Sequence, residues 1–546
     1  MKTVLLSVAT LLATIVFRNS PPVAAQSPSA TASVEGAWAG WLDVAGNYQP
    51  MTVSLAPSET PPGTITNLLS GASRPLGAVV VEGSRVRISL ADPRFPVLTG
   101  VVEGDAISGL AEATGGRTGT FRLIRTASLD VTAKRRYVGA YRFPDGRYLL
   151  MDLGYPPGSD MLYAVDAQTG IARAMYPISP TEFRSGPALL VPEPTEETFY
   201  FDTAGDRITS VVRQSPGRAA ERAVRIEVRE EEVRFRNGDV TLAGTLLLPA
   251  TGGRAAGLVF AHGGGAAVRE QFWGFGYLMA ARGFAVLAFD KRGTGGSSGN
   301  WRGSTFEALA DDVIAGARFL RSRSDVDGRR IGFWGLSQGA WIAPIAAVRS
   351  GDAAFVITLS GGGLTPAQGE LLDSEYEMRK AGMPEQDVLE GLAFQRARDE
   401  FMRTGSDWTD YAARLQRAQT RPWWRLPFTD LSGPASAVDP FWSNTKPFYF
   451  YDPIPTLQRL RAPMLAIFGE FDTPEGVKAN VAGITGALER AKHPDFTIRV
   501  FPNGRHNLMD IGGFAPNEYA RLQRFVPELF ETMASWLERR VMPPSK

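Results

Sequence analysis

A single serine stands between two glycines where an apolar stretch ends. The pattern G-x-S-x-G occupies residues 335–339, and a helix-forming stretch follows it. Glycines at this spacing let a strand and a helix come close together, because they carry no Cβ, and the serine between them then occupies a strained turn with its hydroxyl exposed. The N–H groups that begin the helix point to the same place. The spacing therefore predicts that Ser337 is a nucleophile.

A nucleophilic serine needs a base, and the chain has only three histidines. His506 follows a predicted strand, and a loop there can carry its imidazole to Ser337. His493 lies between a predicted helix and a predicted strand, so we expect it at the surface. His262 precedes three glycines whose N–H groups can approach a substrate oxygen. We predict that His506 is the general base and that His262 belongs to an oxyanion loop.

A carboxylate should orient this imidazole and stabilise its charged form. The segment that ends the strand before His506 contains Glu470 and Asp472. We predict Asp472 as the acid and keep Glu470 as the alternative. The chain order serine, aspartate, histidine fits an alternating α/β sheet and differs from the chymotrypsin-like and subtilisin-like orders.

The elements that must position these residues alternate along the chain. Apolar stretches such as 256–265 and 284–289 alternate with helical segments such as 305–323, in which apolar residues recur at helical spacing. This alternation predicts a mainly parallel sheet with helices on both faces. Further strands are predicted within 462–472 and 495–506, and a closing helix over 518–540.

Residues 364–450 interrupt this alternation. They are first helical and polar and then rich in aromatic side chains. Their place and length predict a helical lid inserted into the catalytic domain, of which 226–363 and 451–546 form the rest. An ordinary segment that covers the sheet is the alternative. The simplest role for Trp423, Trp424 and Trp442 is packing within the lid.

The N-terminal part has a different character. Short alternating apolar stretches, separated by glycine and proline, fill residues 34–225 and predict an all-β barrel or sandwich region. Two modules, 34–128 and 134–214, are possible divisions of it. Because this region contains no histidine and gathers no chemical motif, we expect it to be an accessory region.

The first residues carry a targeting pattern. Lys2 precedes the apolar stretch 4–17, and small residues follow at Ala24 and Ala25. This pattern predicts a signal peptide over 1–25 and a linker over 26–33, with export to the periplasm or the medium. We expect no membrane span after cleavage, since the apolar stretch is short; an uncleaved anchor is the alternative.

Composition excludes several other classes of function. The net charge is +1 and cysteine is absent, so we expect no nucleic-acid partner, no disulfide and no cysteine-bound metal. The scattered histidines form no zinc motif, and the glycine-rich stretch after residue 292 lacks the lysine of a phosphate-binding loop. We therefore expect no metal and no cofactor. The charged residues 290–292 are expected to be scaffold.

Taken together, residues 230–540 resemble the α/β-hydrolase superfamily. The resemblance rests on FAHGGG, FDKRGTGGSSG, GLSQGAW, FGEFDTPEG and GRHNL, which occur in this order. It implies a serine hydrolase fold with Ser337, Asp472 and His506 as its triad. It also implies Gly264 and Gln338 as backbone oxyanion donors, with Gly263 as a second candidate in the loop.

Within this superfamily we expect a carboxylesterase that acts through an acyl-enzyme, because an aromatic lid suits an apolar acyl or aryl group of a small-molecule substrate. A thioesterase or an aminopeptidase is the alternative; Glu370 and Asp373 are the acidic candidates for holding a peptide terminus. A non-catalytic exported binding protein is the alternative from another class. The number of chains in the assembly is left open.

Overall fold

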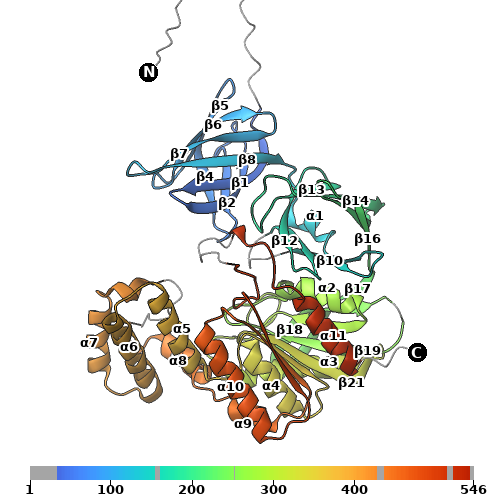
Figure 1. Ribbon diagram of the computed structural model, residues 1–546, viewed down its shortest axis with the longest axis vertical. Helices are drawn as coiled ribbons and strands as arrows, with labels where there is room; N and C mark the ends of the chain where they lie inside the picture. Colours follow the sequence, from blue (N-terminus) through green and yellow to red (C-terminus); the bar gives the residue numbers. More distant parts are fainter. Residues whose placement is uncertain are drawn as a thin grey trace, which may run out of the picture.

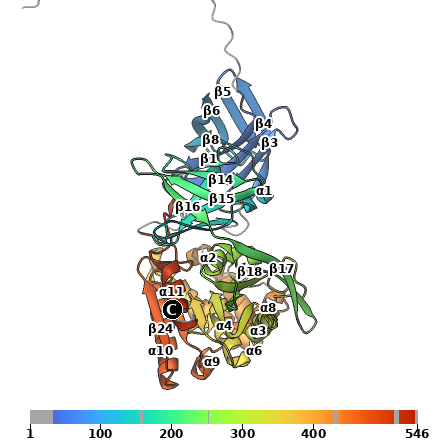
Figure 2. The same ribbon diagram turned by 90° about the vertical axis from the view of Figure 1, so that its right-hand side faces the viewer.

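Three bodies follow one another along the long axis of the computed structural model (Figures 1 and 2). The structure describes residues 33–153, 160–250, 252–426, 434, 436–512 and 520–541. The predicted signal peptide and all but the last residue of the predicted linker lie outside the described residues. No helix of the described ranges is long and apolar enough to cross a membrane.

The first body is a closed antiparallel barrel. Its strands are β1 (Gly36–Val44), β2 (Asn47–Leu55), β3 (Gly63–Asn67), β4 (Ser73–Glu82), β5 (Arg85–Leu90), β6 (Val97–Glu103), β7 (Ala106–Glu112) and β8 (Thr118–Thr126). The barrel closes because β1 pairs with both β2 and β8. Alternate side chains such as Trp38, Ile88 and Ile107 fill its interior, as the period of two predicts.

The second body is another closed barrel, reached through the short helix α1 (Val131–Arg135). Its strands are β9 (Gly139–Arg142), β10 (Tyr148–Leu153), β11 (Leu162–Asp166), β12 (Ala172–Pro177), β13 (Glu182–Ser185), β14 (Glu197–Ala204), β15 (Arg207–Gln214) and β16 (Glu221–Arg225). Every residue of β11 and β12 is buried. Both faces of these strands are therefore covered, the inner one by the barrel interior and the outer one by other parts of the chain.

The third body contains an eight-stranded sheet in the order β17-β18-β20-β19-β21-β22-β23-β24. Its strands are β17 (Val228–Asn237), β18 (Val240–Pro249), β19 (Ala255–Ala261), β20 (Phe284–Phe289), β21 (Val326–Leu336), β22 (Val356–Leu359), β23 (Met464–Gly469) and β24 (Phe496–Phe501). β18 runs antiparallel to both of its neighbours, β17 and β20, and the strands from β20 to β24 in this order run parallel to one another. The predicted fold class, an all-β region followed by a mainly parallel α/β sheet, is confirmed.

Helices cover both faces of this sheet. They are η1 (Arg269–Phe272), α2 (Trp273–Ala281), α3 (Phe306–Arg321), α4 (Gly339–Ser350), α9 (Ile454–Arg459), α10 (Pro474–Arg490) and α11 (Leu529–Val541). Side chains of α3, α4, α9 and α10 pack on one face. Side chains of α2 and α11 pack on the other, in a core that continues into the second barrel. The sheet and the second barrel thus share one hydrophobic core.

The predicted closing helix begins later than expected. It starts at Leu529; residues 520 and 521 have 3₁₀ geometry, and residues 522–526 are not helical. The N–H of Ala172 donates to the carbonyl of Gln523 (3.0 Å), and the N–H of Phe525 donates to the carbonyl of Gly170 (2.8 Å). Pro527 also disfavours a helix before it. The expectation of a helix from 518 was wrong because the second barrel supplies other backbone partners.

The insertion after β22 is helical, as predicted. It contains α5 (Pro366–Lys380), α6 (Glu385–Thr404), α7 (Trp408–Ala418), η2 (Pro422–Arg425) and α8 (Pro440–Tyr449), and it projects to one side of the sheet (Figure 1). Trp423 and Trp442 are buried in a core of its own, against which Trp424 packs. These tryptophans pack within the insertion, as the sequence suggested.

Candidate active site

Ser337 lies in a strained turn between β21 and α4. Its φ is 55°, in the left-handed region that side chains other than glycine rarely occupy. A Cβ on Gly335 would overlap the main chain of Gly339, and a Cβ on Gly339 would overlap the carbonyl of Ala261. Both glycines of the motif are therefore required by contact distance, and the turn that they permit holds Ser337 at the end of the sheet.

Asp472 and His506 form a hydrogen-bonded pair at the same end of the sheet. Nδ1 of His506 lies 3.0 Å from Oδ1 and 2.9 Å from Oδ2 of Asp472. The two residues follow the parallel neighbours β23 and β24, so their loops meet at one edge. Since a carboxylate only accepts, Nδ1 donates and Nε2 is available to accept a proton. Glu470 instead accepts from the N–H of Asn503 (3.3 Å), so the alternative acid does not meet the imidazole.

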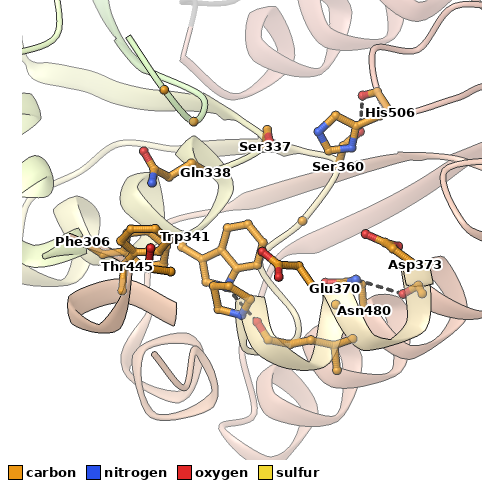
Figure 3. A pocket seen from close by; sticks show the side chains of 18 of the residues that line it. Phe306, Ser337, Gln338, Trp341, Ser360, Glu370, Asp373, Thr445, Asn480 and His506 are labelled. Atoms are coloured by element: carbon orange, nitrogen blue, oxygen red, sulfur yellow. Dashed lines mark hydrogen bonds between the residues drawn. The ribbon is translucent and has the colours of Figure 1, made fainter. Parts of the chain in front are cut away.

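Ser337, Asp472 and His506 line one pocket of about 490 Å³. Figure 3 shows Ser337 and His506 at the rim of this pocket, with Gln338 beside the serine. The side chain of His506 exposes 54% of its surface, so a substrate can reach it. The structure thus brings together the three residues that the sequence proposed as a triad.

The pKa of His506 is raised above its usual value. The surrounding protein desolvates the imidazole, which lowers the pKa, but the charge of Asp472 and its hydrogen bond outweigh this effect. The carboxylate of Asp373 adds to the increase. The pair therefore favours the imidazolium that forms when a base takes a proton from a serine.

The predicted oxyanion donors lie on both sides of Ser337. Gly264 and Gln338 line the pocket. Within the described residues, neither backbone N–H has a protein acceptor, so both can donate to a ligand. Gly263 does not line the pocket, although its Cα is close enough that a Cβ there would lie 3.8 Å from Cβ of Ser337. The first two residues therefore fit the role of donors better than Gly263 does.

Lys291 is scaffold, as expected for residues 290–292, but its contacts with the glycine loop and with Gln338 were not predicted. Its Nζ donates to the carbonyls of Gly263 (2.9 Å) and Gly265 (3.1 Å) and to Oε1 of Gln338 (2.7 Å). The residue is only 2% exposed, and burial lowers the pKa of Lys291 to about 8. The sequence signal that could have revealed these contacts is a lysine at a strand end in a chain with a glycine loop, because such a loop has carbonyls in need of a donor.

The neighbours of Lys291 are scaffold, as expected. Asp290 pairs with Arg269 at 3.0 Å, and Arg292 pairs with Asp312 at 2.6 Å. Both carboxylates are buried, and a buried ion pair holds its two elements in one arrangement.

The other two histidines lie away from the pocket. His262 is buried, its Nε2 bonds to the carbonyl of Phe289, and burial together with the charge of Lys291 lowers its pKa to about 3. It is therefore a neutral anchor at the start of the glycine loop. His493 is only 8% exposed, and its Nε2 lies 3.1 Å from the carbonyl of Ala462. The expected surface position of His493 was wrong, because its loop packs against the segment before β23.

The remaining walls of the pocket come largely from the insertion, from the loop before α3 and from α10. Aromatic residues are prominent among them: Trp301, Phe306, Trp341, Phe441, Phe448 and Phe468. Glu370 and Asp373 of α5 also line it (Figure 3). Glu370 accepts from the hydroxyl of Tyr449 (2.7 Å) and pairs with Arg398 (3.3 Å). The carboxyl of Asp373 is exposed, but the surrounding protein desolvates it enough to raise its pKa. In the described ranges, no three acidic or histidine side chains are grouped to hold a metal ion.

Curated relatives match only a part of this chain. An uncharacterized protein of Mycobacterium tuberculosis (strain H37Rv) is 35% identical over 109 residues, which are 20% of this chain and 38% of the relative. The quorum-quenching protein AidA of Acinetobacter baumannii is 30% identical over 128 residues, 23% of this chain and 42% of that protein. The chain thus spans well under half the length of these relatives.

Two solved structures and a family model complete the comparison. An esterase of Pyrococcus furiosus is 18% identical with a TM-score of 0.36, covering 58% of this chain and 92% of its own. Proline iminopeptidase of Mycobacterium smegmatis is 18% identical with a TM-score of 0.36, covering 57% and 99%. Residues 258–521 match the model of the alpha/beta hydrolase family. With the sheet order and the serine turn described above, this match assigns the C-terminal region of the chain to the alpha/beta hydrolase family.

Proposed function

We propose that this protein is a serine hydrolase that cleaves carboxylic esters through an acyl-enzyme intermediate. The observation that carries the proposal is the Asp472–His506 pair in the same pocket as Ser337 in its strained turn. A nucleophile, a base and an orienting acid in one pocket are the groups that acyl transfer requires.

The chemistry follows from these positions. Oγ of Ser337 attacks the ester carbonyl carbon while its proton passes to Nε2 of His506. Asp472 stabilises the imidazolium, and the N–H groups of Gly264 and Gln338 donate to the oxyanion. The bond to the alcohol then breaks, and the alcohol leaves with the proton from His506. Water, deprotonated by the same base, releases the acid and restores Ser337.

An ester with an apolar acyl or aryl group suits this pocket best. Six aromatic residues line it, and an apolar substrate group gains free energy when it leaves water for such a surface. A thioester presents the same carbonyl chemistry and stays an alternative.

A second candidate is an aminopeptidase, which the acidic side chains of α5 favour. Glu370 and Asp373 both line the pocket, and a carboxylate there can pair with the free amine of an aminoacyl substrate. The charge of Glu370 is already shared with Arg398, so Asp373 is the better candidate for this contact.

A substrate panel tests the proposal. Purified protein is assayed with p-nitrophenyl esters, thioesters and aminoacyl p-nitroanilides, alongside labelling by a fluorophosphonate. We expect ester turnover that falls at least about 1,000-fold in Ser337→Ala, together with loss of labelling. Turnover that survives this substitution would show that Ser337 is not the nucleophile. If no acyl substrate is turned over and the barrels bind polysaccharide, the binding-protein alternative is correct.

A further inference from the structure

We propose that the second barrel positions the general base. It holds the loop of residues 502–512, which carries His506, through a linking segment of residues 520–526. The inference rests on the proposed function, because it assigns a purpose to the loop only if His506 is the base. It gives the second barrel a role in the reaction, whereas the sequence suggested only an accessory region.

The barrel side of the linking segment is a row of backbone hydrogen bonds. Backbone N–H groups of β12 and of the loop after β13 donate to the segment: Ala172 to Gln523 at 3.0 Å, Leu189 to Leu522 at 2.7 Å and Leu190 to Ala520 at 2.9 Å. In the other direction Phe525 donates to Gly170 at 2.8 Å. The buried guanidinium of Arg173 also donates to the carbonyl of Gln523. The segment is therefore paired along its length with the barrel.

The opposite side of the segment binds the histidine loop. The N–H of Asp510 donates to the carbonyl of Arg524 (2.9 Å), and the N–H of Val526 donates to the carbonyl of Leu508 (2.8 Å). Nε of Arg524 pairs with the buried carboxylate of Asp510 (2.9 Å). The linking segment thus lies between barrel and loop, with main-chain bonds to each.

The hydrogen bonds between the linking segment and the histidine loop affect His506 because it lies within a hydrogen-bonded turn of residues 505–509. Arg505 donates to the carbonyl of Met509 (3.1 Å), and Leu508 donates back to the carbonyl of Arg505 (2.8 Å). Leu508 has a φ of 59°, so the turn is strained and needs support from outside. Ser360 directly follows β22, and its hydroxyl donates a hydrogen bond to the carbonyl of His506 (2.8 Å).

Packing supports the same connection. A mostly apolar cavity of about 150 Å³ lies between the barrel and the sheet. Leu150 and Val165 of the barrel line it on one side, and Leu336 and Leu508 line it on the other. Leu336 precedes the nucleophile and Leu508 follows the base, so the barrel also supports both loops through side chains. An error of about 1 Å in the position of a base can lower a rate about 100-fold.

Two glycines of this barrel make a matched test. Gly170 and Gly205 both lie in hairpins and have φ of 77° and 59°. A Cβ on Gly170 would overlap the carbonyl of Phe525, whereas a Cβ on Gly205 meets nothing within 4 Å. Gly170→Ala should therefore displace the linking segment through a steric clash. Gly205→Ala places an alanine in a similar left-handed conformation but causes no clash.

The readouts are kcat, KM, the pH profile and the melting temperature. In Gly170→Ala we expect kcat to fall at least about tenfold with KM within about twofold. We also expect a lower pKa of His506, since a displaced loop weakens the contact with Asp472 that raises it. Gly205→Ala should keep the kcat of the unmodified protein. Equal kcat in both variants, or a loss confined to KM, would overturn the inference.

A second substitution avoids the clash if Gly170→Ala does not fold. Arg524→Met removes the ion pair with Asp510 and should lower kcat and the pKa of His506, and Arg524→Lys should restore part of both. An Arg524→Met protein with unchanged kcat and pKa would contradict the inference. Because the chain has only three histidines, NMR titration can follow His506 without any substrate. If the unmodified protein turns over no acyl substrate, the proposed function is wrong. The NMR titration needs no substrate, so it still shows separately whether the barrel positions His506.

Discussion

At the scale of single residues, the serine turn depends on the absence of two methyl groups. Gly335 and Gly339 touch main-chain atoms that cannot move without breaking the sheet or starting α4 elsewhere. The left-handed φ of Ser337 is kept only because this packing enforces it. The most local pattern in the sequence is therefore also the most tightly constrained part of the fold.

Substituting Gly335 should destabilise the protein. We expect Gly335→Ala to lower the free energy of unfolding by about 3 kcal/mol and to abolish ester turnover, because the new Cβ forces the strand from the helix. Urea denaturation and the ester assay measure both effects. Gly252→Ala, where a Cβ meets nothing within 4 Å, is the control and should change neither. An unchanged unfolding midpoint in Gly335→Ala would contradict the packing argument.

The His506–Asp472 pair predicts the pH dependence of the reaction. His506 must be unprotonated to act as a base, so kcat/KM rises with pH through its pKa, which lies above the usual 6.5. Asp472→Asn removes the charge that raises this pKa, so the rise should move to lower pH while kcat falls by about 10,000-fold. The pH–rate profile measures both.

Glu470→Gln serves as the control for that prediction. It removes a neighbouring carboxylate that bonds to Asn503 and not to the imidazole, so the profile should stay in place. A larger effect of Glu470→Gln than of Asp472→Asn would reverse the assignment of the acid.

Lys291 should matter to the transition state more than to substrate binding. Without its three hydrogen bonds the glycine loop and Gln338 lose their common donor, so we expect Lys291→Met to lower kcat about 100-fold with little change in KM. A trifluoromethyl ketone, whose adduct needs the oxyanion donors, should lose affinity in parallel. Lys478→Met, at an exposed ion pair, is the matched control. A change in KM alone would show that Lys291 acts on substrate binding instead.

At the scale of elements, α5 decides what the pocket offers a substrate. This one helix brings Glu370 and Asp373 into a pocket that six aromatic residues also line. If amine-bearing substrates are accepted, Asp373→Asn should lower kcat/KM for aminoacyl substrates about tenfold and leave neutral esters unchanged. Parallel assays with both substrate classes measure the ratio.

The matched control for α5 is Glu375→Gln on the same helix. Glu375 pairs with Arg379 on the exposed side, so its removal should leave both substrate classes unaffected. Equal losses for esters and aminoacyl substrates in Asp373→Asn would indicate an effect on His506, whose pKa Asp373 helps to raise, and not recognition of an amine.

At the scale of the whole molecule, the two barrels differ in how they join the hydrolase sheet. The first barrel has an interior core of its own and adds the buried residues Ala39, Tyr48 and Leu68 to the larger core, whereas the interior of the second barrel itself belongs to the larger core that includes the sheet. We expect a chain that begins at residue 129 to fold and to keep ester turnover. A chain that begins at residue 226 should be insoluble or much less stable, because it exposes apolar surface that the barrel covers. Solubility and melting temperature of the two truncated proteins test this difference, and a stable chain from residue 226 would contradict it.

The sequence by itself determined the features that depend on residues close together along the chain. The alternation of strands and helices, the short alternating strands of the β-rich region and the G-x-S-x-G turn are local patterns, and each is carried by residues within about one element of each other. Ser337, Asp472 and His506 each follow a predicted parallel strand. Because parallel strands end at one edge of a sheet, their order along the chain also predicted that the three residues lie at the same edge.

Only the tertiary structure decided the contacts between distant residues. It placed Asp472 and not Glu470 against the imidazole, buried His493, and gathered three acceptors around Lys291. It also kept residues 522–526 out of a helix, since hydrogen bonds to a barrel more than 300 residues away outweighed local helical preference. These contacts depend on which groups lie close together in the folded chain, and the spacing of residues along the sequence does not reveal this.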